Sequence, residues 1–92
     1  MSDQASVTVD ICNARGLHAR ASAKFVKLAS SFQSEVKVTR DGVTVDARSI
    51  MGLLMLGAGQ GSTLELTAEG PDAEAALDAV VALVEARFDE EA

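Results

Sequence analysis

Three stretches of the chain alternate apolar and polar residues, which is the pattern of a strand with one buried face. The first spans residues 7–11, the second residues 35–40 and the third residues 64–69. A period of two places every second side chain on the same face of a sheet. Asp41-Gly42 is a typical hairpin turn, because glycine adopts positive φ without steric penalty, and the return strand opens at Val43. The pattern therefore predicts four strands.

Apolar residues at helical spacing predict three helices. The first runs from Ala19 to about Phe32, the second is short and starts at Ser49, and the third starts around Asp72. Serine and aspartate are preferred N-cap residues, so Ser49, and Asp72 or a neighbour, are expected to bind the free amides of their helices. The third helix has an apolar stripe that is expected to be buried and to end near Phe88: Ala73, Leu77, Val80, Val81 and Val84. The last four residues, DEEA, are expected to fray.

The element order is strand–helix–strand–strand–helix–strand–helix, with no linker and no internal repeat. A chain of 92 residues, 48% of them apolar, suits one modest core rather than two. We therefore predict a single domain over residues 1–92 with an α+β fold. It is an open-faced β-sandwich, whose four-stranded, mostly antiparallel sheet is covered on one face by three helices. Because only three residues are aromatic, the core is expected to be mainly aliphatic.

Composition narrows the class of protein. The one cysteine, Cys12, excludes an internal disulfide and is typical of a reducing compartment. Residues 1–10 have neither the basic nor the apolar segment of a signal peptide. The longest apolar run, residues 50–58, is much shorter than the roughly 20 residues that span a bilayer. We expect a cytoplasmic protein without membrane insertion, and a monomer is the simplest oligomeric state.

Charge is unevenly distributed along the chain. A net charge of −6 argues against nucleic-acid binding. Residues 11–34 nevertheless contain no Asp or Glu, although the chain holds 14 acidic residues. The same window contains half of the basic residues: Arg15, Arg20, Lys24 and Lys27. This pattern predicts a local site for an anion or an acidic partner, and a merely solvated basic face is the alternative.

The only histidine, His18, lies in this window, at or next to the start of the first predicted helix. Helix N-termini expose unpaired N–H groups and the positive end of the peptide dipoles, so they bind anions. A neutral imidazole has a free ring nitrogen that is a nucleophile. These groups together suit attack on phosphorus. The backbone amide at Ala19 and the guanidinium groups of Arg15 and Arg20 are the candidates for holding the transferred phosphoryl group.

Three other interpretations of His18 compete with this one. A histidine at a helix start is often only a polar capping residue. A metal site is disfavoured because one histidine and one cysteine form a poor ligand set, and no cofactor is predicted. A hydrolase with Ser22 as nucleophile would need an acid to orient His18. The local segment has none, although one could come from elsewhere in the chain.

Three segments in the correct order resemble HPr, the histidine-containing phosphocarrier family of the bacterial phosphoenolpyruvate-dependent phosphotransferase system. They are GLHAR with the helix that follows it, then SIMGLLML, then EGPDAEAAL, and the resemblance covers essentially the whole chain. It implies that His18 is phosphorylated at Nδ1 by enzyme I and passes the group to an acceptor domain of the IIA type. It also implies that Arg20 contacts the phosphoryl group, and that the chain is a stoichiometric carrier rather than an enzyme.

The sequence departs from this family at Ala21. Most members that serve sugar uptake have proline directly after the arginine, where it fixes φ and removes an N–H. Alanine sets no φ and supplies an additional N–H. The continuation Ala-Ser-Ala-Lys-Phe is similar to the branch devoted to nitrogen-linked or metabolic regulation, so a sugar-linked and a nitrogen-linked role both stay open.

The short helix at Ser49 is the second feature that the resemblance singles out. A serine in this position is the regulatory phosphorylation site of a dedicated HPr kinase/phosphorylase in many bacteria, and a phosphate there would lie on the helix N-terminus. The apolar residues that follow cannot all be buried on one face of two turns. The resemblance implies that some of them form a partner-binding surface with a basic rim. The centre would be Ile50, Met51 and Leu54 or Met55, and the rim Arg20, Lys24 and Lys27.

Two other functions are compatible with the same elements. A regulatory binding module of this fold would act through Ser49 and the apolar helix without an obligatory phosphohistidine, and the intact GLHAR segment disfavours it. A small-molecule sensor of ferredoxin-like topology follows from the element order alone, and no residue signature supports it.

Overall fold

A computed structural model describes residues 3–91 and contains all of the predicted elements. The strands are β1 (Gln4–Asp10), β2 (Glu35–Arg40), β3 (Val43–Asp46) and β4 (Thr63–Glu69). The helices are α1 (Ala19–Ser30), α2 (Ile50–Met55) and α3 (Ala73–Glu85), and a short 3-10 turn, η1 (Arg87–Asp89), follows α3. The first helix therefore ends two residues earlier than Phe32, which lies beyond it and is half-buried.

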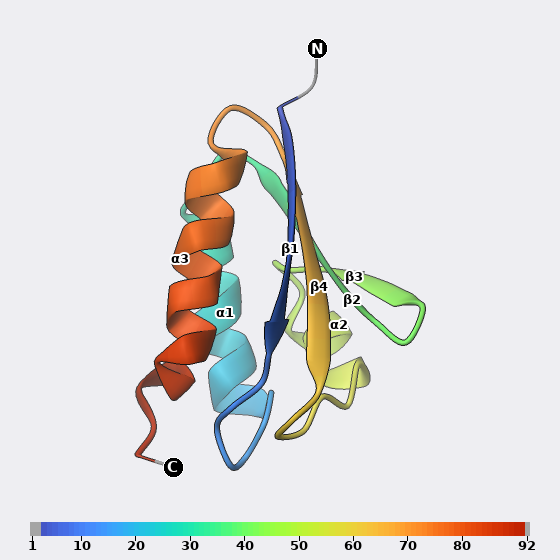
Figure 1. Cartoon of the computed structure of the whole chain (residues 1–92), viewed down its shortest axis with the longest axis vertical. Coiled ribbons are helices and arrows are strands. Elements are labelled where there is room, and N and C mark those ends of the chain that lie inside the picture. The colour runs from blue at the N-terminus through green and yellow to red at the C-terminus, as the bar shows by residue number, and fades with distance from the viewer. Residues whose placement is uncertain (1–2, 92) are drawn as a thin grey trace.

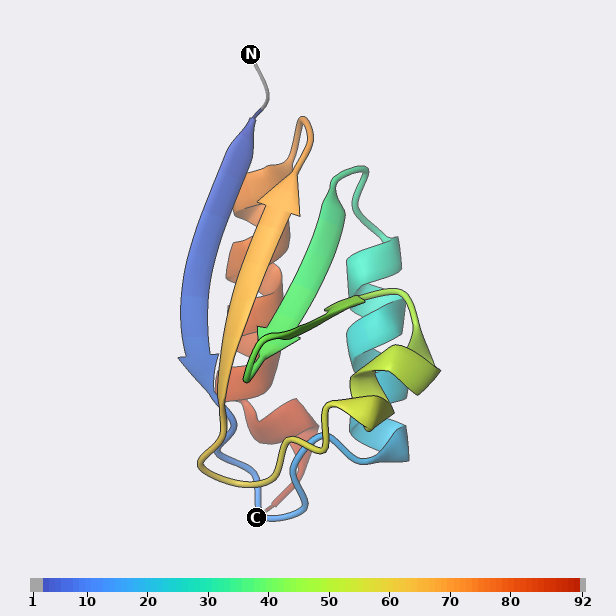
Figure 2. The ribbon, with the colours of Figure 1, turned by 90° about the vertical axis from the view of Figure 1, so that its right-hand side faces the viewer.

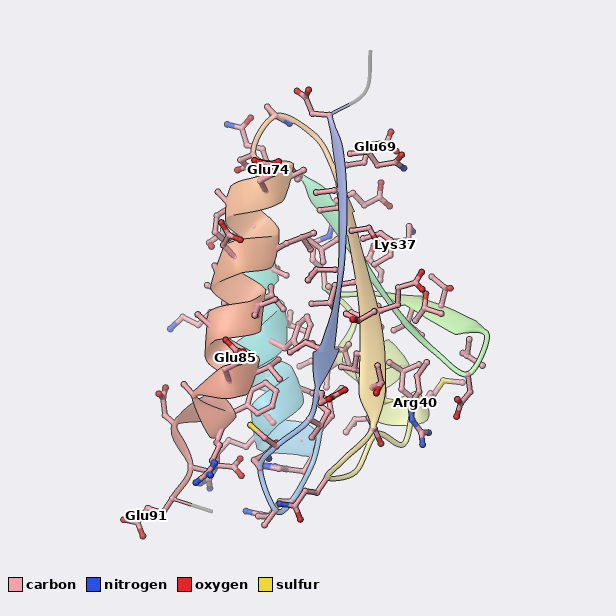
Figure 3. All side chains as sticks on the ribbon, in the orientation of Figure 1. Lys37, Arg40, Glu69, Glu74, Glu85 and Glu91 are labelled. Atoms are coloured by element: carbon pink, nitrogen blue, oxygen red, sulfur yellow. The ribbon has the colours of Figure 1, made fainter. Side chains whose placement is uncertain are left out.

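The strands form one sheet in the order β1-β4-β2-β3, and all neighbouring pairs are antiparallel. Helices α1 and α3 lie side by side on one face of the sheet (Figure 1). Helix α2 packs on α1 and on β3 (Figure 2). The opposite face of the sheet is open, and Lys37 and Glu69 project from it, away from the helices (Figure 3). The predicted open-faced α+β sandwich is confirmed.

The register brings the apolar positions of the strands onto the helix-covered face. Val9 pairs with Leu64 and Val38 with Leu66, and all four side chains are buried. The core is mainly aliphatic, as the composition predicts, with Phe25 and Phe88 as its largest buried side chains. The α3 stripe is buried at the predicted positions except Val81, which is only half-buried.

The prediction that the Asp72 side chain caps α3 is wrong. Asp72 occupies the N-cap position, but its side chain binds no amide of its own helix. Its carboxylate instead accepts hydrogen bonds from the backbone N–H of Gln33, at 3.0 Å, and from that of Ser34, at 2.8 Å. The hydroxyl of Ser34 donates a third bond, at 2.5 Å. Asp72 therefore ties the start of α3 to the segment that enters β2.

These three bonds make the stability of the fold depend on pH. The Ser34 hydroxyl and the Gln33 amide hold the pKa of the Asp72 carboxyl below its ordinary value. A depressed pKa in the folded state stabilises the fold above the unfolded-state pKa of about 3.9, and this stabilisation is lost as pH falls through the folded-state pKa. In urea titrations, the free energy of unfolding should fall less between pH 7 and pH 3 in Asp72→Ala than in wild type. The control Asp78→Ala, at an exposed position of the same helix, should lose as much as wild type.

Candidate functional site

His18 is the N-cap residue of α1 and presents one ring nitrogen to the start of that helix. Its backbone is extended, with φ −75° and ψ −179°. Ser22 N–H donates the first helical hydrogen bond to the His18 carbonyl, at 2.8 Å. The amides of residues 19–21 precede this bond and have no intrahelical acceptor. One of them, Arg20 N–H, donates to Nδ1 of the His18 ring, at 3.2 Å.

Gly16 fixes the loop that leads into His18. Its φ is +65°, and a Cβ atom there would lie 2.5 Å from the carbonyl oxygen of Ala58 and 2.7 Å from the Cα atom of Gly59. Both are backbone atoms of the loop after α2, so no side chain can be accommodated. The next residue, Leu17, donates its N–H to the same Ala58 carbonyl, at 2.8 Å. Close contact between two loops therefore holds the start of α1 in place.

The other ring nitrogen of His18 contacts a residue that the sequence did not suggest. Nε2 is hydrogen-bonded to Oε2 of Glu90, in the C-terminal tail. The second oxygen of that carboxylate, Oε1, accepts from the side-chain amide of Asn13 at 3.0 Å, and the same amide also donates to the Gly16 carbonyl at 2.8 Å. Hydrogen bonds from His18 and Asn13 hold the pKa of the Glu90 carboxyl below its usual range.

Glu90 reaches the ring because the chain turns sharply after α3. Three consecutive residues that are not glycine, Arg87, Phe88 and Asp89, have φ of 59°, 53° and 62°. Left-handed backbone costs an L-residue about 1–2 kcal/mol, so this turn requires compensation. The Phe88 side chain is fully buried, and the Phe88 carbonyl accepts a hydrogen bond from Nζ of Lys24 at 2.6 Å. Figure 1 shows the tail at the same end of the molecule as the start of α1.

The prediction that the tail frays is therefore wrong for Asp89 and Glu90, while Ala92 lies outside the described residues. The reason is that Phe88 belongs to the core and fixes the path of the residues after it. The sequence signal for this is weak. One indication is that an apolar residue, Phe88, lies three positions after the last residue of α3. The other is that the segment around His18 contains no acidic residue, so a carboxylate partner of the histidine has to come from a distant segment.

The hydrogen bonds of His18 distinguish its two ring nitrogens. Because Nδ1 accepts from Arg20 N–H, a neutral imidazole in this position has its proton on Nε2, facing Glu90, and its lone pair on Nδ1, at the positive end of α1, where it can act as a nucleophile. A carboxylate behind an imidazole stabilises the positive charge that the ring gains when its other nitrogen forms a bond. The side chain of His18 is 16% exposed, so the ring can be reached from solvent.

Ser22 does not share this chemistry. Its side chain is fully buried, and its hydroxyl donates to the Leu17 carbonyl at 3.2 Å. An acid does orient His18, as the hydrolase interpretation required, but the serine points elsewhere. Within residues 3–91 no cluster of three or more metal-ligating side chains exists.

The predicted basic residues surround the start and one side of α1. Arg15, Arg20 and Lys27 are exposed, and within the described part of the chain the guanidinium groups of Arg15 and Arg20 form no salt bridge. Ala19 is exposed in the first helical turn, and Ala21 is buried. Lys24 is half-buried, and its ammonium group donates to the Phe88 carbonyl.

Helix α2 presents an apolar surface, as predicted. Ile50, Met51, Leu54 and Met55 are exposed, with 69% of Met51 and 76% of Met55 accessible, whereas Leu53 and Leu56 are buried. Ser49 is the N-cap residue, and its hydroxyl oxygen accepts from Gly52 N–H at 3.0 Å. The loop that follows α2 accepts a hydrogen bond from Leu17 N–H, and Leu17 directly precedes His18. The helix with the apolar surface is therefore linked to the segment that presents His18.

Comparison with known proteins identifies the family. A family model described as the PTS HPr component phosphorylation site matches residues 5–86. A phosphocarrier protein HPr from Cupriavidus necator is 56% identical over 80 residues, which are 87% of this chain and 90% of that protein. A phosphocarrier protein NPr from Shewanella violacea is 51% identical over 82 residues, 89% of this chain and 90% of that one. A crystal structure of HPr from Thermoanaerobacter tengcongensis superposes with a TM-score of 0.92 at 48% identity, covering 96% of this chain and 99% of that chain.

The fold and these matches define a small phosphocarrier protein of the phosphotransferase system. The chain belongs to the PTS-HPr family. Within residues 3–91 none of the helices has the length and apolar character needed to cross a bilayer.

Proposed function

We propose that His18 is the residue that carries the phosphoryl group, that phosphorylated enzyme I is the donor, and that a IIA-type protein is the acceptor. In the loading step, the Nδ1 lone pair attacks phosphorus, the bond between phosphorus and the atom that carries it on enzyme I breaks, and the electron pair of that bond returns to that atom. The proton on Nε2 stays in place. The ring of His18 gains a positive charge beside Glu90, and the transfer to the acceptor reverses these steps.

The observation that carries this proposal is the orientation of the His18 ring. Nδ1 lies at the N-terminus of α1 and accepts from Arg20 N–H, while Nε2 is held by Glu90. A phosphoryl group on Nδ1 would take the place of the lone pair at the helix start, where amides of the first turn stabilise negative charge. A group on Nε2 would have to displace the Glu90 carboxylate.

Incubation with phosphoenolpyruvate and purified enzyme I tests the proposal. The mass of the chain should rise by one phosphoryl group, the modification should be lost in acid, and addition of a IIA-type protein should remove it. Enzyme I alone, without phosphoenolpyruvate, is the control. A chain that gains no mass in the complete mixture would contradict the proposal.

Arg20 is proposed to stabilise the transferred group through its exposed guanidinium. Arg20→Ala should slow loading from phosphorylated enzyme I by about 100-fold, because a positioned donor to a developing oxyanion contributes an effect of this size. Rapid-quench measurement of the loading rate checks this. Lys37→Ala, which removes one positive charge from the open face of the sheet, is the matched control and should load at the wild-type rate (Figure 3). Equal rates for the two variants would remove Arg20 from the mechanism.

We further propose that the exposed side chains of α2 form the docking surface, with Arg20, Lys24 and Lys27 as its basic rim, and that Ser49 regulates it when phosphorylated by an HPr kinase/phosphorylase. The Ser49 oxygen already faces the amides at the start of α2, so the helix accommodates an added phosphate. The new charge would lie directly beside Ile50 and Met51. Apolar contact with a partner is disfavoured next to such a charge, because its hydration would be lost on docking.

A phosphate mimic at Ser49 should therefore weaken docking. Ser49→Asp is expected to raise the Kd for enzyme I about tenfold, measured by calorimetry. Ser49→Ala is the control, since it removes the cap, at about 1 kcal/mol of stability, without adding charge, and it should bind as wild type does. An unchanged Kd for Ser49→Asp would contradict the regulatory role.

A sugar-linked and a nitrogen-linked role both stay open, and the relatives include proteins named HPr and NPr. The choice between them is a choice of acceptor. The regulatory branch stays the prediction from the Ala21 segment, and it is tested by which IIA-type protein removes the phosphoryl group faster. A cytoplasmic location and a monomeric state also stay predictions.

A further inference from the structure

We propose that the C-terminal segment from Arg87 to Glu90 is a built arm that holds the Glu90 carboxylate against His18, and that Glu90 is a positioning residue for phosphoryl transfer. This inference rests on the proposed function of His18. It concerns residues outside the family match, which ends at residue 86.

The geometry of Glu90 indicates a dedicated contact. Each carboxylate oxygen has its own donor, Nε2 of His18 for one and the Asn13 amide for the other. Only 17% of the Glu90 side chain is exposed, although glutamate is one of the residue types that are rarely enclosed. A glutamate that merely solvates a tail has no reason to be so enclosed.

Asn13, the hydrogen-bond donor to the second carboxylate oxygen of Glu90, is also held in place by its surroundings. Asn13 is fully buried and reaches Glu90 while it also binds the Gly16 carbonyl, so it links the carboxylate to the loop that precedes His18. The side-chain oxygen of Asn13, Oδ1, is buried and has no hydrogen-bond partner within residues 3–91. The amide is thus oriented to donate to Glu90, at the expense of an unsatisfied acceptor, which burial makes unfavourable.

The backbone that delivers Glu90 is strained at three successive residues and is anchored at two points. Phe88 places its ring in the core, and its carbonyl receives the Lys24 ammonium from α1. Strain of this kind persists only where the surroundings hold it, and it concentrates at functional positions. Lys24 lies in α1 and His18 is the N-cap residue of α1, so the arm is bound to the helix that presents the histidine.

The role follows from the change in charge at the ring. When Nδ1 bonds to phosphorus, the ring becomes positively charged while Nε2 keeps its proton, and the hydrogen bond to the Glu90 carboxylate becomes an ion pair. The carboxylate therefore stabilises the loaded state and the transition state that leads to it more than the free histidine. It also prevents the ring from turning, which keeps Nδ1 at the helix start.

Glu90→Ala should slow loading from phosphorylated enzyme I about tenfold, the size expected for a charged hydrogen bond at a partly exposed site. The effect should appear in kcat and leave KM near the wild-type value. Glu91→Ala is the matched control, because it removes the same charge from the next residue, which is exposed and lies at the outer end of the tail (Figure 3). Glu90→Gln keeps an oxygen for Nε2–H but lacks the charge, so its rate should fall between those of wild type and Glu90→Ala.

A second readout needs no phosphorylation. In the unloaded protein, the Nε2 proton of His18 should give a slowly exchanging, downfield NMR resonance in wild type and Glu91→Ala, and this resonance should be absent in Glu90→Ala. If wild type takes up no phosphoryl group, the proposed function fails whatever the resonance shows. If wild type is loaded but Glu90→Ala matches it in rate, or retains the resonance, the positioning role of Glu90 is overturned and the function of His18 stands.

Discussion

Replacing His18 with alanine is expected to abolish the uptake of a phosphoryl group from phosphorylated enzyme I. The reason is that Nδ1 is the only nucleophilic ring nitrogen at the start of α1, and its neighbours supply hydrogen-bond donors rather than a second nucleophile. The nearby hydroxyl of Ser22 is buried and bonded to a backbone carbonyl. Mass spectrometry of the intact chain after incubation with phosphoenolpyruvate and enzyme I measures the loss.

The fold must survive this change for the result to be interpretable. His18 also caps α1, and an alanine N-cap costs about 0.5–2 kcal/mol. His18→Asn keeps a side-chain oxygen that caps a helix, so it should restore stability without restoring uptake. A His18→Ala or His18→Asn chain that still gains an acid-labile phosphoryl group would show that the group is carried elsewhere.

Replacing Phe88 with alanine is expected to lower the free energy of unfolding by about 3–5 kcal/mol, because the side chain is fully buried and its removal leaves a cavity. Few single changes in a domain of this size should cost more. The same change removes one of the two anchors of the Arg87–Glu90 arm. The downfield Nε2 resonance of His18 should therefore weaken, although Phe88 has no hydrogen bond to the ring.

Urea titration followed by circular dichroism measures the first effect, and NMR of the folded fraction measures the second. Phe32→Ala is the matched control, because it deletes the same atoms from a half-buried position outside the arm. It should cost less and leave the resonance of His18 unchanged. Equal losses of stability in the two variants would contradict the role assigned to Phe88.

The elements of this fold could be predicted because each rests on a local pattern. Alternation through Val36 and Val38 requires only that one face be buried, and Ser49 caps a helix through an amide three residues away. The hairpin at Asp41-Gly42 follows from the φ that glycine permits, and both residues have positive φ. The position of His18 at the start of α1 likewise follows from the switch of period after Gly16.

The features that the sequence did not predict depend on partners far along the chain. Asp72 could have capped its own helix. Ser34, 38 positions earlier, instead offers both a hydroxyl and an amide, and the Asp72 carboxylate accepts hydrogen bonds from these rather than from the amides of α3. Glu90 lies 72 positions from His18. Its approach depends on the left-handed backbone at residues 87–89, which no residue preference indicates, since none of the three is glycine. Burial of Phe88 decides that path, and only the assembled core shows it.

The most direct test of the account is to identify the nitrogen that bears phosphorus. The chain is labelled with ¹⁵N-histidine, loaded with phosphoenolpyruvate and enzyme I, and examined by NMR for coupling between ³¹P and the two ring nitrogens of His18. The account predicts coupling to Nδ1, with the proton retained on Nε2. Coupling to Nε2, or a phosphoryl group on any other residue, would contradict it.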